Sequence, residues 1–181
     1  MAQIDKMIDD IIRIEGGYSD HKDDSGGKTR YGIIESVARK WGYHGDMRNL
    51  PLELAKTIYK EEYYIEPNFV SVGALSTKLA IELFDTGVNC GVRTASKFLQ
   101  RCLNVLNQQA KLYPDLVVDG QLGRISIAAL SAYLRRRGKE GETVLLRMLN
   151  ALQGAYYIEL AERREKDESF IYGWILHRVV I

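Results

Sequence analysis

The sequence has almost no net charge. It contains 25 lysines and arginines against 24 aspartates and glutamates, a formal net charge of +1. This balance does not produce the strong positive field of a dedicated nucleic-acid binder. We therefore interpret the basic run Arg135-Arg136-Arg137 as a solvated helix end, and we expect no nucleic-acid partner.

Cysteine and histidine are also scarce. Cys90 and Cys102 are predicted to lie on one helix, where the intervening twelve residues span roughly 18 Å. A disulfide tolerates Cα separations of up to about 7 Å, so we expect two free thiols. The three histidines, His21, His44 and His177, are too scattered to indicate a zinc site. We expect no metal and no other cofactor.

Long apolar runs are missing as well. No stretch approaches the roughly 18 apolar residues of a membrane span. Asp9 and Asp10 fall inside what would have to be the apolar region of a signal peptide. We therefore expect a chain made in the cytoplasm without a Sec signal peptide and without a membrane span. A target outside the cytoplasm would require another route of delivery.

Apolar residues recur at helical spacing along most of the chain. The first such run ends at Glu15, where Gly16-Gly17 stops the helix. Further helices are predicted over about 35–41, 51–64, 76–89, 93–107, 124–134, 142–166 and from 170 onward, with a loop at 139–141. The glycine-rich residues 16–34 favour an irregular loop or a short hairpin. The pattern predicts one mainly α domain of about seven helices over residues 1–181, with a small N-terminal lobe.

Glu15 stands where a catalytic acid would be expected. A carboxyl group between a packed helix and an open loop can be partly desolvated, which raises its pKa and lets it hold a proton near neutral pH. A lone glutamate at a helix end is nevertheless more often a solvated residue. The surrounding motifs therefore decide between these two interpretations.

Five strings in the expected order resemble a known family. They are Glu15-Gly16-Gly17-Tyr18, Asp24-Ser25-Gly26-Gly27-Lys28-Thr29, Tyr31-Gly32-Ile33, Leu83-Phe84-Asp85-Thr86-Gly87-Val88-Asn89, and Gly173-Trp174 with Arg178. The sequence is similar to glycoside hydrolase family 108, the N-acetylmuramidases found among phage endolysins and secretion-activator proteins. The resemblance implies a lysozyme-like α+β fold. It also implies a catalytic part over residues 1–82 and a helical part over 83–181 that includes a peptidoglycan-binding segment.

Three positions depart from the patterns of related enzymes. Family members usually carry Thr where this chain has Ile34, and often Pro where it has Ser25. Neither position must carry a proton, so we expect substrate fit to be affected rather than activity. The inverting phage lysozymes, a more distant resemblance, place a threonine fifteen residues after the catalytic glutamate. Here Thr29 follows Glu15 by fourteen residues.

Hydrolysis of a glycosidic bond needs a proton donor and a second group on the opposite face of the sugar. The resemblance implies that Glu15 is the acid, and Asp24 is the favoured second carboxylate, ahead of Asp20 and Asp23. Aspartates also shape turns by bonding to backbone amides, and this interpretation of Asp24 stands on equal terms. A carboxyl separation of about 6.5–9.5 Å would give inversion, the outcome expected by analogy with the phage lysozymes, and about 5 Å would give retention.

Further residues receive supporting roles. Glycines would let the loop approach the glycan closely, and tyrosines are candidates for sugar subsites, although packing is the better expectation for any one ring. The substrate-binding candidates are Tyr18, Gly26, Gly27, Thr29, Tyr31, Tyr63 and Tyr64. Asp85 and Asn89 would share one helix face as a polar support of the cleft or a helix C-terminal device. Trp174 is expected to anchor the last helix, and Arg178 to pair with an acid there.

The sequence thus predicts a peptidoglycan hydrolase that cleaves the β-1,4 bond between N-acetylmuramic acid and N-acetylglucosamine. It would serve cell-wall lysis or local wall opening for protein export. A lytic transglycosylase and a non-catalytic peptidoglycan-binding module remain alternatives, whereas the charge balance disfavours a nucleic-acid-binding regulator. The expected partners are peptidoglycan glycan strands in the periplasm or cell wall, with a holin or other export machinery for delivery.

Overall fold

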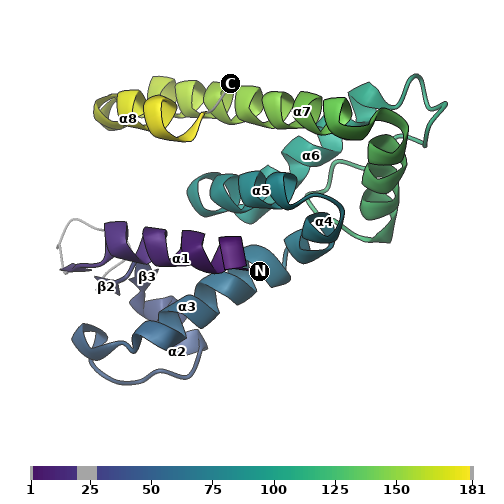
Figure 1. Ribbon diagram of the computed structural model, residues 1–181. Helices are drawn as coiled ribbons and strands as arrows, with labels where there is room; N and C mark the ends of the chain where they lie inside the picture. The colour runs from purple at the N-terminus through teal and green to yellow at the C-terminus, as the bar shows by residue number, and fades with distance from the viewer. Residues whose placement is uncertain (1, 20–27, 180–181) are drawn as a thin grey trace. The chain divides into compact units, whose positions relative to one another are not determined.

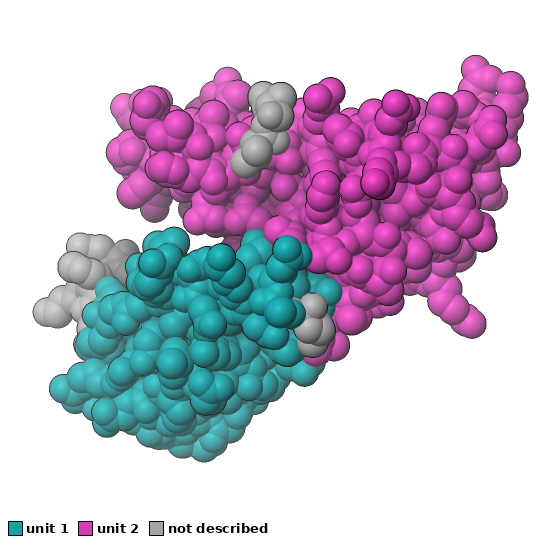
Figure 2. Space-filling view, viewed as in Figure 1, with its two compact units in different colours: residues 1–64 teal, residues 65–181 magenta. Residues whose placement is uncertain are grey.

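The structure is a computed structural model that describes residues 2–19 and 28–179, with the backbone alone at Glu15. The chain divides into two compact units, residues 1–64 and residues 65–181, which Figure 2 colours separately. Helices dominate both units, and a small sheet belongs to the first (Figure 1). The mainly α fold with a small N-terminal lobe is therefore confirmed. The division into parts 1–82 and 83–181 stays a prediction. Within the described ranges, no helix is long and apolar enough to cross a bilayer.

Two helices form the core of the first unit. Helix α1 (Ala2–Glu15) packs on α3 (Leu52–Lys60). The apolar residues of α1 repeat every four positions, so they share one face of the helix, and that face is buried. Its buried members are Ile4, Ile8 and Ile12. Two ion pairs also join these helices, Lys56 with Asp9 at 2.7 Å and Lys60 with Asp5 at 3.1 Å.

The glycine-rich segment after α1 contributes a three-stranded antiparallel sheet in the order β1-β2-β3. The strands are β1 (Tyr18–Ser19), β2 (Thr29–Arg30) and β3 (Ile33–Ile34). Tyr18 lies opposite Arg30, and Arg30 lies opposite Ile33. The predicted hairpin is present, and a third strand adds to it.

The remainder of the first unit is helical. Helix α2 (Glu35–Lys40) and a 3₁₀ turn (Met47–Asn49) precede α3. The single helix predicted over about 51–64 is wrong in its last turn, because α3 gives way there to a π-helical turn (Glu61–Ile65). Pro51 lies just before α3. An N–H group at this position would have no hydrogen-bond partner within the helix, so proline, which lacks the N–H, is well tolerated there.

A central helix organises the second unit. Helix α5 (Thr77–Cys90) packs against α4 (Phe69–Leu75), α6 (Val92–Leu106) and α7 (Arg124–Arg163). The α5 side chains that are at most 1% exposed are Leu79, Ala80, Leu83, Phe84 and Thr86. The sequence pattern missed α4, because its seven residues are too few to establish a helical period.

Helix α7 contains the largest departure from the predicted elements. A loop was expected at 139–141, yet those residues are helical and the only non-helical backbone inside α7 is at Gly138, with φ 58° and ψ −145°. Figure 1 shows the helix turning steeply at this point. A 3₁₀ turn (Glu165–Asp167) then leads to the last helix, α8 (Glu168–Arg178).

Both cysteines are free, as predicted, and the structure shows that both are buried. Their expected location on one helix is wrong, because Cys90 is the last residue of α5 and Cys102 belongs to α6. Gly91, with φ 91°, separates the two helices. Burial raises the pKa of Cys90 to about 11 and the pKa of Cys102 to about 12, so both thiols stay protonated at neutral pH.

Candidate functional site

Glu15 is the last residue of α1, directly before the glycines that lead into β1. A Cβ atom at Gly16 would lie 2.7 Å from the carbonyl oxygen of Ile12, so the chain can leave the helix along this path only with a glycine there. The helix therefore ends where the sequence predicted. The Glu15 side chain lies outside the described residues, as do Asp24, Gly26 and Gly27 and the alternative carboxylates Asp20 and Asp23.

The sheet brings several of the candidate substrate residues next to the end of α1. Tyr18 follows Glu15 by three residues, which span at most about 11 Å of chain, and it pairs with Arg30 across the sheet. The Tyr18 side chain is exposed, whereas Thr29 on β2 is half-buried. Backbone pairing thus places the β2–β3 turn close to the proposed acid.

The β2–β3 turn holds Tyr31 in an uncommon conformation. Tyr31 and Gly32 have φ values of 55° and 75°, the pattern of a type I′ turn, in which both central residues are left-handed. The Tyr59 hydroxyl donates a hydrogen bond of 3.0 Å to the Tyr31 carbonyl oxygen. Arg30 lies over the Tyr31 ring at 4.9 Å and donates to its hydroxyl at 3.1 Å. These contacts hold a tyrosine where glycine or asparagine is usual.

Tyr63 and Tyr64 lie in the π-helical turn. The Tyr63 ring is half-buried, 5.6 Å from the ring of Tyr59, and burial raises the pKa of Tyr63. Tyr64 is only 4% exposed and so has little surface to offer a sugar. Sugar binding by either ring stays a prediction.

The sequence interpretation missed Glu62, which lies in the same turn. Its Oε1 accepts hydrogen bonds from the indole N–H of Trp41 at 2.9 Å and from Lys40 Nζ at 3.4 Å. The carboxylate side chain is 19% exposed. π-Helical turns are rare and often mark functional sites. No local sequence pattern predicted these contacts of Glu62, because Trp41 and Lys40 lie 21 and 22 positions before it in the chain.

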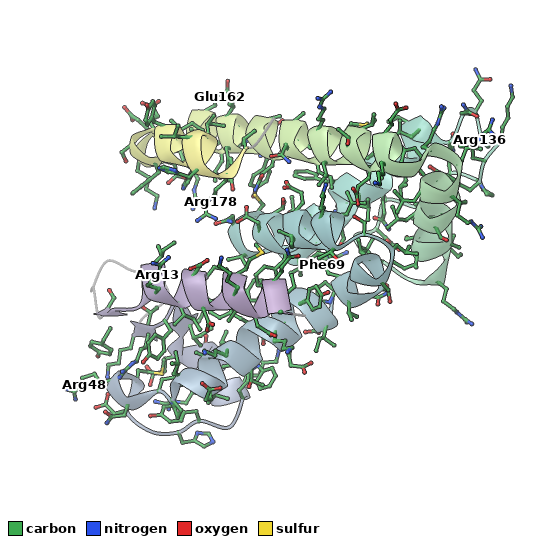
Figure 3. The ribbon with its side chains drawn as sticks, viewed as in Figure 1. Arg13, Arg48, Phe69, Arg136, Glu162 and Arg178 are labelled. Carbon is green, nitrogen blue, oxygen red and sulfur yellow. The ribbon has the colours of Figure 1, made fainter. Side chains whose placement is uncertain are left out.

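Asp85 forms the centre of a polar network in the second unit. Its carboxylate accepts from Arg178 Nη1 at 3.0 Å and from Gln153 Nε2 at 3.1 Å, and Asn89 Nδ2 donates to its carbonyl oxygen at 2.7 Å. Figure 3 labels Arg178, which extends from α8 toward α5. The expected pairing of Arg178 with an acid is confirmed. Trp174 lies 5.3 Å from Tyr157 of α7, ring centre to ring centre, as expected of a residue that anchors α8.

Glu82 lies one turn before Asp85 on α5, and the sequence did not single it out. Burial raises its pKa to about 7, the nearby Asp85 charge adds to this, and a hydrogen bond with Asn150 opposes it. Its Oε1 atom is buried and has no hydrogen-bond partner among the described residues. Among all the residues that the structure describes, no group of histidine, cysteine and acidic side chains could hold a metal ion.

Comparison with known families assigns both halves of the chain. Residues 8–91 match the family described as Glycosyl hydrolase 108, and residues 94–179 match the family described as Predicted Peptidoglycan domain. The two matches leave only short segments uncovered. The first segment is therefore a glycosyl hydrolase 108 domain, and the second segment is a predicted peptidoglycan domain. The chain is a glycoside hydrolase with a role related to peptidoglycan.

Comparison with solved structures supports the fold. The structure of Brucella abortus SagA aligns over 95% of this chain and 95% of that chain, with a TM-score of 0.63 and 20% sequence identity. At this level of identity the similarity concerns the fold alone. No curated protein matches the chain.

Proposed function

We propose that the chain is an N-acetylmuramidase that cleaves the β-1,4 bond between N-acetylmuramic acid and N-acetylglucosamine in peptidoglycan. The observation that carries the proposal is the position of Glu15. It ends a helix whose inner face is packed, it precedes a glycine turn and a sheet, and it lies within the segment that matches the glycosyl hydrolase family. The peptidoglycan domain over residues 94–179 supports the choice of substrate.

In the proposed reaction, Glu15 donates its proton to the oxygen that leaves the anomeric carbon. A water molecule attacks the same carbon from the opposite face and gives its proton to a second carboxylate, for which we propose Asp24. This single displacement inverts the configuration. The Arg30, Tyr31 and Tyr59 contacts support the proposal because they hold the adjoining turn rigid, and a rigid turn loses little freedom when a glycan binds beside it.

The Glu15→Gln variant tests the assignment, because glutamine keeps the size of the side chain and has no acidic proton. We expect release of reducing ends from purified peptidoglycan to fall by about 10²-fold or more. Glu53→Gln is the matched control, since this glutamate side chain is 83% exposed on α3, and it should keep full activity. Undiminished hydrolysis by Glu15→Gln would refute the assignment of the acid.

The products distinguish the alternative functions. Mass spectrometry of released fragments should show reducing ends formed with water. Anhydro-sugar ends would instead identify a lytic transglycosylase, and binding to sacculi without any release would identify a non-catalytic module. We further propose that the enzyme is made in the cytoplasm and reaches the wall with a holin or export machinery. Lysis of cells that depends on co-expression of such a partner tests this route.

A further inference from the structure

A cavity of about 460 Å³ lies in the second unit where α7 begins. Its volume is within the range of about 300–1,000 Å³ that is usual for small-ligand sites. The lining residues used below are Asp119, Val117, Arg124 and Ile125. All of them fall within the predicted peptidoglycan domain, residues 94–179.

The rim of the cavity is rigidly built around Gln100, which is 1% exposed. Its Oε1 accepts from the Gly120 N–H at 2.8 Å, and its Nε2 donates to Asp119 Oδ1 at 2.9 Å and to the Gln121 carbonyl at 3.1 Å. Gly120 has φ 78°, and a Cβ atom there would lie 2.9 Å from the carbonyl oxygen of Arg93. A loop fixed in this way loses little entropy when a ligand binds.

Two acids line the cavity, Asp115, whose Oδ1 already accepts a hydrogen bond from Asn107, and Asp119. The Asp119 Oδ1 accepts hydrogen bonds from the Gln100 side chain and from the Gln121 N–H, and these bonds lower the pKa of Asp119, so the group is ionised at neutral pH. Its second oxygen, Oδ2, is not used by either of these two bonds. The carboxylate can therefore receive a cationic donor from a ligand.

Arg124 supplies the positive charge. It is the first residue of α7, its side chain is exposed, and it forms no ion pair with any described residue. The preceding Gly123 provides no side-chain cap, so the first N–H groups of α7 add to the attraction of Arg124 for an anion. Asp119 and Arg124 thus line one cavity as opposite charges that form no ion pair with each other.

Two large aliphatic side chains complete the lining. Val117 is 78% exposed and Ile125 is 77% exposed, although both are β-branched residues of the kind normally found in a core. Such surfaces beside a charge pair suit a ligand that joins an aliphatic chain to a charged end. A glycan would leave Asp119 unmatched, because its N-acetylglucosamine is neutral and its muramic acid carries at most a carboxylate and no cation.

We propose that this cavity binds the peptide part of peptidoglycan at a zwitterionic amino-acid end, with the ammonium group on Asp119 and the carboxylate on Arg124. The aliphatic part of the same residue lies against Val117 and Ile125. The proposal rests on the proposed function, because peptidoglycan is the source of such a peptide. In substrate recognition, the second unit then holds the peptide while the glycan is cut elsewhere.

The test measures binding of a tripeptide ending in meso-diaminopimelic acid to the full chain carrying Glu15→Gln, by calorimetry. Asp119→Asn and Arg124→Gln should each weaken binding roughly tenfold, since each removes one charge-assisted hydrogen bond. Acetylation of the free side-chain amine or amidation of its carboxylate should weaken binding to a similar extent. Arg101→Gln, which removes an equal charge on another groove of the same unit, is the control and should bind as the parent does.

Several outcomes would overturn the proposal. These are no binding by the parent chain, unchanged binding in Arg124→Gln, or competition by peptide-free glycan strands. Arg124 is exposed, so its variant remains informative even if Asp119→Asn fails to fold. The two proposals fail separately: persistent hydrolysis by Glu15→Gln refutes the assigned acid, whereas unchanged tripeptide binding by Arg124→Gln refutes only the peptide site.

Discussion

Arg178 and Asp85 form an ion pair of 3.0 Å between residues that are 93 positions apart, and it ties the last helix to the central helix of the second unit. The two side chains are 29% and 25% exposed, so solvent screens the pair only in part. Gln153 donates to the other oxygen of the same carboxylate. Helix α8 has no buried residue of its own, so this ion pair and the contact of Trp174 with Tyr157 help to hold it in place.

Asp85→Ala is expected to lower the free energy of unfolding by about 2–3 kcal/mol, because it leaves the partly buried Arg178 without its carboxylate partner and the buried Gln153 without one of its two acceptors. Urea denaturation followed by circular dichroism measures the loss. Arg163→Ala, which breaks the exposed pair between Arg163 and Glu159, is the control and should change stability by less than about 0.5 kcal/mol. Equal effects of the two variants would contradict the assigned role of Asp85.

Glu82 predicts a pH dependence of stability. Its pKa is raised from 4.5 to about 7 in the folded chain, so the folded state retains a proton that the unfolded state releases. Stability therefore falls as the pH rises from about 4.5 to 7 and stays lower above that range. Glu82→Gln should stabilise the chain by up to about 3 kcal/mol at pH 8 and by little at pH 4.5. A stability difference that does not change with pH would count against this account. Glu53→Gln is the control, because this glutamate side chain is 83% exposed, and its effect on stability should not show this change with pH.

The β2–β3 turn predicts a dependence on residue type at position 31. Tyr31→Val should destabilise the chain by about 1–2 kcal/mol, since a β-branched residue is strongly disfavoured at the observed φ of 55°. Tyr31→Asn should stay within about 1 kcal/mol of the parent, because asparagine tolerates this conformation but loses the contact with Arg30. Thermal unfolding of the two variants gives the comparison. A more stable valine variant would argue against the left-handed turn.

Gly120 and Gly123 offer a matched pair of alanine substitutions. Gly120→Ala should destabilise the chain by about 2 kcal/mol, because φ is 78° and the new Cβ atom would meet the carbonyl oxygen of Arg93. Gly123→Ala should change stability by less than about 0.5 kcal/mol, because φ is −76° and no atom lies within 4 Å of the new Cβ. The difference in melting temperature checks the prediction. Equal melting temperatures would contradict the described loop.

Local sequence patterns predicted the features that neighbouring residues determine. The apolar face of α1 and the glycines after it placed the helix end at Glu15, and the buried run in α5 identified the central helix. Short or irregular sequence patterns did not predict the elements correctly. The seven residues of α4 gave too short a pattern, and the break in α7 came at Gly138 rather than in the polar residues after it.

By itself, the sequence determined the mainly α composition and the likeness to glycosyl hydrolase 108. It also placed the proposed acid at a helix end, because a helix ends through residues adjacent in the chain. Only the tertiary structure decided which acids are buried, paired or open to a ligand. Glu82 is desolvated and Asp85 is bonded by residues 68 and 93 positions away. Asp119 is held by Gln100, 19 positions earlier. Burial and charge pairing depend on segments that meet only in the folded chain, so no local pattern encodes them.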